Sequence, residues 1–111
     1  WNNMNPGLLK SSAHKFIEVL LSPGRNELDI LEEMEELLNA GPARKTMISF
    51  AEELTFLLQK VLHNIYFENV AFEQIEEWAG ILRQSMREFE LLNLNAKNMI
   101  QSLFFKMKAV I

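Results

Sequence analysis

Two histidines, His14 and His63, are the side chains of this sequence best suited to acid–base chemistry near neutral pH. A histidine that activates a hydroxyl nucleophile must lie beside it, and neither histidine falls in a recognisable serine or threonine nucleophile motif. His14 precedes Glu18 by four residues, which is the spacing of an ordinary surface pair on a helix. The chain has no cysteine, so thiol nucleophiles, thiolate zinc sites and disulfides are excluded together. We therefore predict that the protein is not an enzyme.

Carboxylates are concentrated between positions 26 and 40, where six acidic residues occur without a basic one. A di-iron carboxylate bundle would need Glu-x-x-His on facing helices, and the sequence contains no such spacing. Glycine-rich phosphate loops and the EF-hand pattern are absent as well. We expect Glu32, Glu33 and Glu36 to form a solvated face that steers a binding partner, and we expect neither a metal nor a cofactor.

The overall charge is unfavourable for binding to nucleic acid. The formal net charge is −4 and the pI is about 5.2, whereas phosphate backbones and anionic lipids attract clustered lysine and arginine. Basic residues without acids occur at the C-terminal end, as Lys97, Lys106 and Lys108. The neighbouring segments are acidic and would repel phosphate, so we predict no nucleic-acid partner.

No apolar run approaches the roughly 18 to 20 residues that a membrane helix requires, and we predict no membrane span.

The elements that must position these residues are helices, because apolar residues recur at intervals of three and four along the chain and never alternate as in a strand. Proline and glycine interrupt the pattern at residues 5–7, 22–24 and 41–42. We expect helices over residues 5–21 and 26–40, then one that begins between 42 and 49, one after 69, and one that begins near 93–95. The last two could be one kinked helix.

Helix ends and buried faces follow from the same pattern. Pro42 suits the first turn of the third helix, but Ser49 and Glu52 form an equally good capping box, so its start stays open. In the second helix, we expect the buried stripe to consist of Leu28, Leu31, Met34 and Leu38.

Leaving such stripes in water would cost many kcal/mol at ~25 cal/mol per Å² of apolar surface. We therefore predict an all-α fold: a compact bundle of four to five mostly antiparallel amphipathic helices in a single domain, residues 1–111. Because position 1 is Trp and the sequence shows neither a secretory signal nor a glycosylation sequon, we expect a domain excised from a larger intracellular, cytoplasmic protein.

A second apolar stripe marks the third helix as a possible docking element. At 100° per residue, Phe56, His63 and Phe67 fall within ~40° of one another and nearly opposite Leu54. Two interpretations are open: the helix is central and packs on both sides, or it is one wall of a groove that accepts a partner helix or aromatic anchor. In the second interpretation, His63 supplies a hydrogen bond and a pH-sensitive charge.

Phe105 gives the last helix apolar character on a second side. It lies about 140° from Ile100 around that helix and directly follows Phe104. It can pack against a loop or contribute to a binding surface.

These observations predict a non-catalytic adaptor or regulatory module. It would bind a protein partner, such as an amphipathic helix, or self-associate. The alternative is a helical carrier that holds a lipid or another apolar small molecule in a core rich in Phe, Leu and Met. The residues predicted to bind a partner are Phe56, His63, Phe67 and Phe105, with the acids Glu32, Glu33 and Glu36.

Overall fold

A computed structural model describes residues 6–62 and 72–111 of the chain. Within these residues the chain forms six helices and no strand, which confirms the all-α prediction. No helix in this part of the chain is both long and apolar enough to cross a membrane. The helices are α1 (Pro6–Leu21), α2 (Glu27–Glu33), α3 (Glu35–Leu38), α4 (Ala43–Leu62), α5 (Phe72–Leu92) and α6 (Ala96–Lys108).

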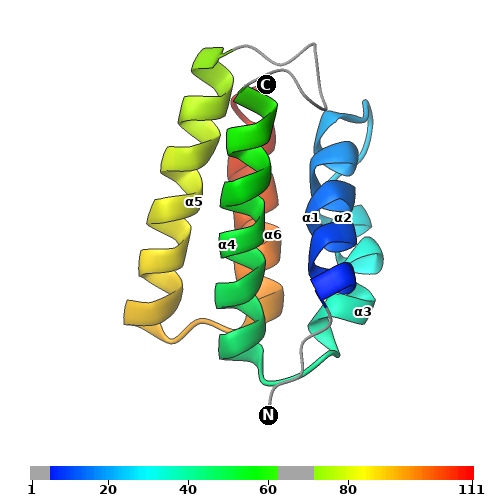
Figure 1. Cartoon of the computed structure of the whole chain (residues 1–111), viewed down its shortest axis with the longest axis vertical. Coiled ribbons are helices and arrows are strands. Elements are labelled where there is room, and N and C mark those ends of the chain that lie inside the picture. The colour runs from blue at the N-terminus through cyan, green and yellow to red at the C-terminus, as the bar shows by residue number, and fades with distance from the viewer. Residues whose placement is uncertain (1–5, 63–71) are drawn as a thin grey trace.

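The helices stand side by side in a bundle (Figure 1). The helix α4 occupies the centre of the front face between α1 and α5, while α6 lies behind it and α2 lies behind α1. The pairs with the most extensive packing are α1 with α4, α2 with α6, α4 with α5, and α5 with α6. Long helices that follow one another along the chain are antiparallel, as predicted, whereas α1 and α4 run in the same direction.

The core is filled by large side chains from every long helix. Phe16 of α1 meets Phe50 of α4 and Phe104 of α6 in edge-to-face contacts, with ring centroids 5.7 and 5.6 Å apart. The indole Nε1 of buried Trp78 donates a hydrogen bond to the carbonyl of Met107 at 3.0 Å, which ties α5 to the end of α6. Most stripes predicted from the sequence are buried here, so one dry core joins all the elements.

The predicted helix over 26–40 is wrong in one respect, because it is two helices. Its start is as expected: Asn26 accepts hydrogen bonds from the backbone of Leu28 and Asp29, and Asp29 accepts one from the backbone of Asn26. At Met34, however, φ is −99° and ψ is 8°, so α2 ends there and α3 begins. This break makes the number of helices six instead of four to five.

The buried stripe of this segment also differs from the prediction. Leu28 is 65% exposed, and the residues fully buried are Ile30, Met34 and Leu37. The segment offers leucine or isoleucine at enough positions to satisfy two helical faces. Packing against α1 and α6 determines which of these two faces is buried, and this packing cannot be deduced from the periodicity of the sequence.

The backbone between α5 and α6 shows that the last two predicted helices are separate and are not one kinked helix. Asn93 adopts the left-handed conformation with φ of 53°, and the amide of Leu94 donates to the carbonyl of Phe89. This is the usual way in which a helix terminates. Asn95 then caps α6 by accepting a hydrogen bond from the amide of Asn98 at 2.8 Å. They are therefore separate helices joined by a tight turn.

The start of α4 follows the proline. The helix begins at Ala43, and the amide of Thr46 donates to the carbonyl of Pro42 at 2.9 Å. Ser49 lies inside the helix, so it does not cap the first turn.

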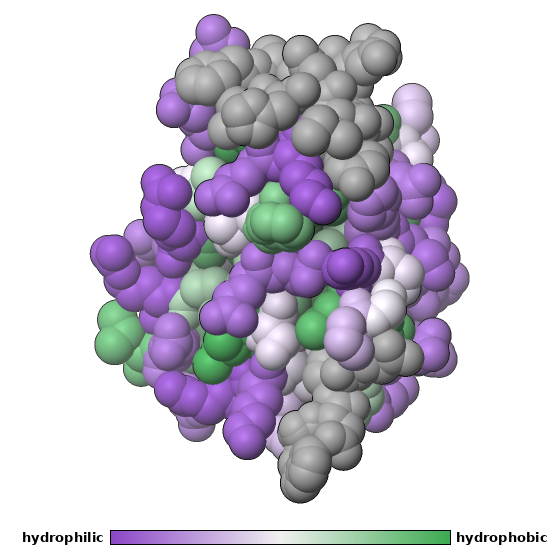
Figure 2. Space-filling view, in the orientation of Figure 1, coloured by the Kyte–Doolittle hydropathy of each residue, from purple (hydrophilic) through white to green (hydrophobic). Residues whose placement is uncertain are grey.

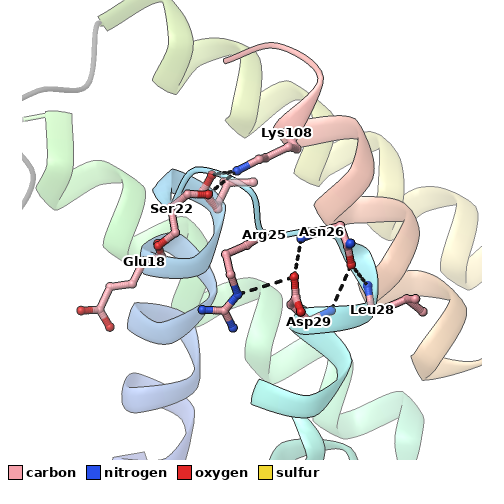
Figure 3. A network of polar contacts seen from close by, with 8 residues as sticks. Glu18, Ser22, Arg25, Asn26, Leu28, Asp29 and Lys108 are labelled. Carbon is pink, nitrogen blue, oxygen red and sulfur yellow. Dashed lines mark hydrogen bonds and ion pairs between the residues drawn. The ribbon is translucent and has the colours of Figure 1, made fainter.

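A polar network joins the last turn of α6 to the connection between α1 and α2 (Figure 3). The ammonium of Lys108, in the last turn of α6, donates to the carbonyls of Leu20 at 2.9 Å and Ser22 at 2.8 Å. Arg25 pairs with Asp29 at 3.6 Å beside it. Since the last carbonyls of a helix lack intrahelical donors, Lys108 supplies the end of α1 with a partner.

An exposed contact between α5 and α6 gives a pH-dependent prediction. Hydrogen bonds from Gln84 and Lys106, together with the Lys106 charge, lower the pKa of Glu88 below its ordinary value of 4.5. A carboxyl whose pKa is lower in the folded state stabilises the fold above the unfolded-state pKa, and this contribution is lost as the pH falls through the folded-state pKa. We expect Glu88→Gln to lower the melting temperature slightly at neutral pH and to match the parent protein only at a pH well below 4.5, where Glu88 is protonated in the folded protein as well.

The matched control for this prediction is Glu76→Gln, which removes the same charge from an exposed site on the same helix. Thermal unfolding of the three proteins across acid pH would measure the effect. A Glu88→Gln difference that stays constant from neutral to acid pH would contradict the assignment.

Candidate functional site

The residues predicted to bind a partner are distributed over different helices. Phe56 on α4 is 49% exposed and Phe105 on α6 is 60% exposed, so neither is part of the core. Glu32 and Glu33 lie on α2 and Glu36 on α3. His63 and Phe67 lie outside the described residues, and their alignment with Phe56 remains a prediction.

Phe56 lines a groove between α1 and α4 with a volume of about 140 Å³. Ala13 and Leu57, which are almost completely buried, form its apolar floor. Four polar side chains surround this floor: Lys10 and His14 from α1, and Glu53 and Lys60 from α4. We call this feature the Phe56 groove.

Helical spacing explains why these particular side chains meet. Positions three and four apart share one face of a helix, and Lys10, Ala13 and His14 have this spacing on α1. The lining residues of α4 have the same spacing, so each helix presents one wall. The two walls meet because α1 packs closely against α4.

The Phe56 ring is held in place at the mouth of the groove. The ammonium of Lys60, one turn further along α4, lies 4.5 Å from the ring centroid. Such a cation–π contact at an exposed site contributes about 0.5–1 kcal/mol. The ring is therefore oriented in advance while about half of its surface stays in water.

The acidic residues form a different feature, on another side of α1. Glu32, Glu33, Glu35 and Glu36 line a wide surface depression of about 760 Å³ together with four further residues. Two of these, Leu8 and Lys15, come from α1. At 100° per residue, they lie about 150° around α1 from the residues of the Phe56 groove. The acidic depression and the Phe56 groove thus border opposite sides of α1 and do not share a surface.

Phe105 does not belong to the Phe56 groove. Its neighbour Phe104 points into the core against Phe16, and the next residue of a helix is rotated by 100°, so Phe105 points out of the bundle. Sequence analysis grouped the two exposed phenylalanines, but the structure places them on helices that face different parts of the surface.

Hydrophobic groups on the front of the molecule are small and separate. Figure 2 shows green areas framed by purple hydrophilic side chains over α4 and α5, without a continuous apolar patch. A second groove of about 390 Å³ runs between these two helices and has Ile48, Leu82 and Met86 beside charged residues. The sequence did not reveal it, because its walls come from two helices whose packing against each other is not contained in helical periodicity.

The contribution of α1 to the Phe56 groove was not predicted from the sequence. His14 was interpreted as a surface residue paired with Glu18, yet it is half-buried and lines the groove near Phe56. Lys10 has the same position one turn earlier. A single sequence carries no signal for this contact, since it depends on how α1 and α4 pack.

The described lining of the groove contains an imidazole and a carboxylate but no hydroxyl side chain that His14 could activate. In the part of the chain that the structure describes, no three His, Cys, Asp or Glu side chains are grouped to hold a metal ion. The groove offers apolar contact, hydrogen bonds and charge.

Comparison of the chain with protein-family models, with characterised proteins and with solved structures finds no match.

Proposed function

We propose that this chain is a non-catalytic interaction module that binds a helix of a protein partner through the Phe56 groove. The observation that carries this proposal is a half-exposed, pre-oriented aromatic ring beside a small groove with an apolar floor. Interfaces are dominated by a few aromatic anchors of this kind, surrounded by polar residues. From the absence of cysteine and of a sequon in the sequence, we propose that it acts inside the cell.

The available surface is large enough for such a role. A phenylalanine can bury about 150–250 Å², and roughly half of that is still exposed at Phe56. Covering about 100 Å² at ~25 cal/mol per Å² contributes about 2.5 kcal/mol to binding. Because Lys60 already orients the ring, little conformational entropy is lost when a partner covers it.

The carrier alternative has less support. Small-molecule sites usually have volumes of about 300–1,000 Å³, and the two described depressions of this size, of about 390 and 760 Å³, lie on the surface beside charged residues and not in the core. The centre of the bundle is occupied by fully buried side chains, among them Trp78, Phe16 and Phe50.

The test uses Phe56→Ala. We expect this variant to lose about 2 kcal/mol of folding free energy, roughly half the cost of a core truncation, because only half of the ring is buried and it makes one exposed cation–π contact. Chemical denaturation measures this quantity. Helical peptides selected from a displayed library on the parent protein are expected to lose binding to Phe56→Ala.

Phe105→Ala is the matched control, because it removes a ring that is also about half-exposed from another helix. Selected peptides should bind this variant as well as the parent. Peptides that bind the parent and Phe56→Ala equally would contradict the proposal, and so would a loss of several kcal/mol of stability in Phe56→Ala.

A further inference from the structure

We infer that the partner segment for the Phe56 groove is an acidic helix that presents one apolar side chain between carboxylates. This inference rests on the proposed function and adds the chemistry of the partner. Three observations carry it: the charges around the groove, its volume, and the position of the acidic depression.

The groove has the opposite charge to the molecule as a whole. Among the described lining residues, Lys10 and Lys60 stand at its edge against one carboxylate, Glu53, whereas the whole chain has a formal net charge of −4. His14 adds a further group that can donate a hydrogen bond. A carboxylate-bearing segment is therefore attracted to this part of the surface, and a basic one is not.

The volume of the groove limits the apolar part of the partner. A space of about 140 Å³ corresponds to roughly five water molecules at about 30 Å³ each, which is the space of one medium-sized apolar side chain. That side chain would lie on Ala13 and Leu57 and against the exposed Phe56 ring. On a partner helix, residues three and four positions away lie one turn to either side, where they can reach the lysines of both walls.

The acidic depression adds specificity. Glu32, Glu33, Glu35 and Glu36 line the surface on the far side of α1, and they repel an acidic helix that approaches there. Repulsion at a competing site directs a partner as effectively as attraction at the correct one. The acidic face that was predicted to attract a partner would thus act by keeping an acidic helix away from this side of α1.

A fluorescent peptide of about fifteen residues tests the inference. The probe is an alanine-rich helix with one central phenylalanine and glutamates one turn to either side, and its control carries glutamine at those positions. Two exposed charge pairs contribute about 1 kcal/mol together, so anisotropy titration of the full chain should show the glutamate peptide binding about fivefold tighter. The difference should shrink as salt rises from about 0.05 to about 0.5 M.

Variants of the protein test whether the preference for the glutamate peptide comes from the lysines of the groove. We expect Lys10→Gln with Lys60→Gln to abolish the preference for glutamate, and Lys45→Gln with Lys97→Gln to keep it, since these exposed lysines lie outside the groove. Equal binding of the two peptides would overturn the inference, and so would an equal loss in both double variants. If either result occurred while Phe56→Ala still abolished binding, the proposed function would stand without the acidic partner.

The other possible occupant is a second copy of the chain, which carries its own acidic helix. Sedimentation of the parent protein over a range of concentrations distinguishes this case. A monomer supports the inference. A dimer that Lys10→Gln with Lys60→Gln dissociates would overturn it in favour of self-association.

Discussion

Replacing Phe16 with alanine is expected to lower the free energy of unfolding by about 4 kcal/mol. The side chain is fully buried and links three helices, because its ring contacts Phe50 on α4 and Phe104 on α6 edge-to-face. Truncation removes apolar contacts, leaves a cavity and breaks both aromatic pairs. Since small domains are stable by only about 5–15 kcal/mol, this one change would remove a large part of the stability.

Urea denaturation measures the effect, and a loss of this size should move the midpoint by about 2 M. Phe16→Leu is the milder variant, expected to cost about 1–1.5 kcal/mol, and it keeps the test informative if Phe16→Ala does not fold. Phe56→Ala is the matched control, since it deletes an identical ring from an exposed position. Similar losses in Phe16→Ala and Phe56→Ala would mean that the core is not where the structure places it.

The contrast between these two phenylalanines shows what periodicity predicts well. Phe16 and Phe50 lie on apolar stripes with three-to-four spacing along their helices, and both are fully buried. Phe56 lies off its main stripe, and the sequence allowed either a second packed side or a docking surface. The structure leaves its ring half-exposed. Burial on a dominant stripe follows from the hydrophobic effect alone, whereas burial on a minor stripe depends on whether another helix is present on that side.

The segment 26–40 shows where local reasoning fails. Its N-terminal cap was predictable because it is local: the side chains of Asn26 and Asp29 each accept a hydrogen bond from the backbone N–H of the other residue. The break at Met34 was not, since nothing in the sequence stops a helix there. Met34 is fully buried, so tertiary contacts with the remaining helices determine both the break and the choice of buried face.

The candidate site was predictable only in part for the same reason. Phe56 could be identified from one helix, because its position relative to Leu54 depends on helical geometry alone. Lys10 and His14 could not, because they reach the groove through the packing of α1 on α4. The steering acids were found as a cluster, but their position on the far side of α1 changes their proposed effect from attraction to exclusion.

Lys108 illustrates a contact between residues far apart in the sequence that has a measurable effect on stability. Its ammonium donates to the carbonyls of Leu20 and Ser22 (Figure 3), and it lies where the negative end of the α1 dipole favours a cation. Charged hydrogen bonds contribute about 1.5–3 kcal/mol each when they are buried. Because Lys108 is only half-buried, water replaces part of the loss, and we expect Lys108→Met to cost about 2 kcal/mol.

Methionine is the informative replacement because it keeps an unbranched apolar chain over the core and removes only the charge. Lys97→Met is the matched control: it lies in the first turn of the same helix, is exposed, and faces the positive end of the helix dipole, so its removal should be neutral or slightly stabilising. Hydrogen exchange gives an independent measurement, since Lys108→Met should increase exchange at the end of α1 and at the start of α2 more than in α4. Equal stability of the two variants would show that the carbonyls of Leu20 and Ser22 are satisfied as well by water as by Lys108.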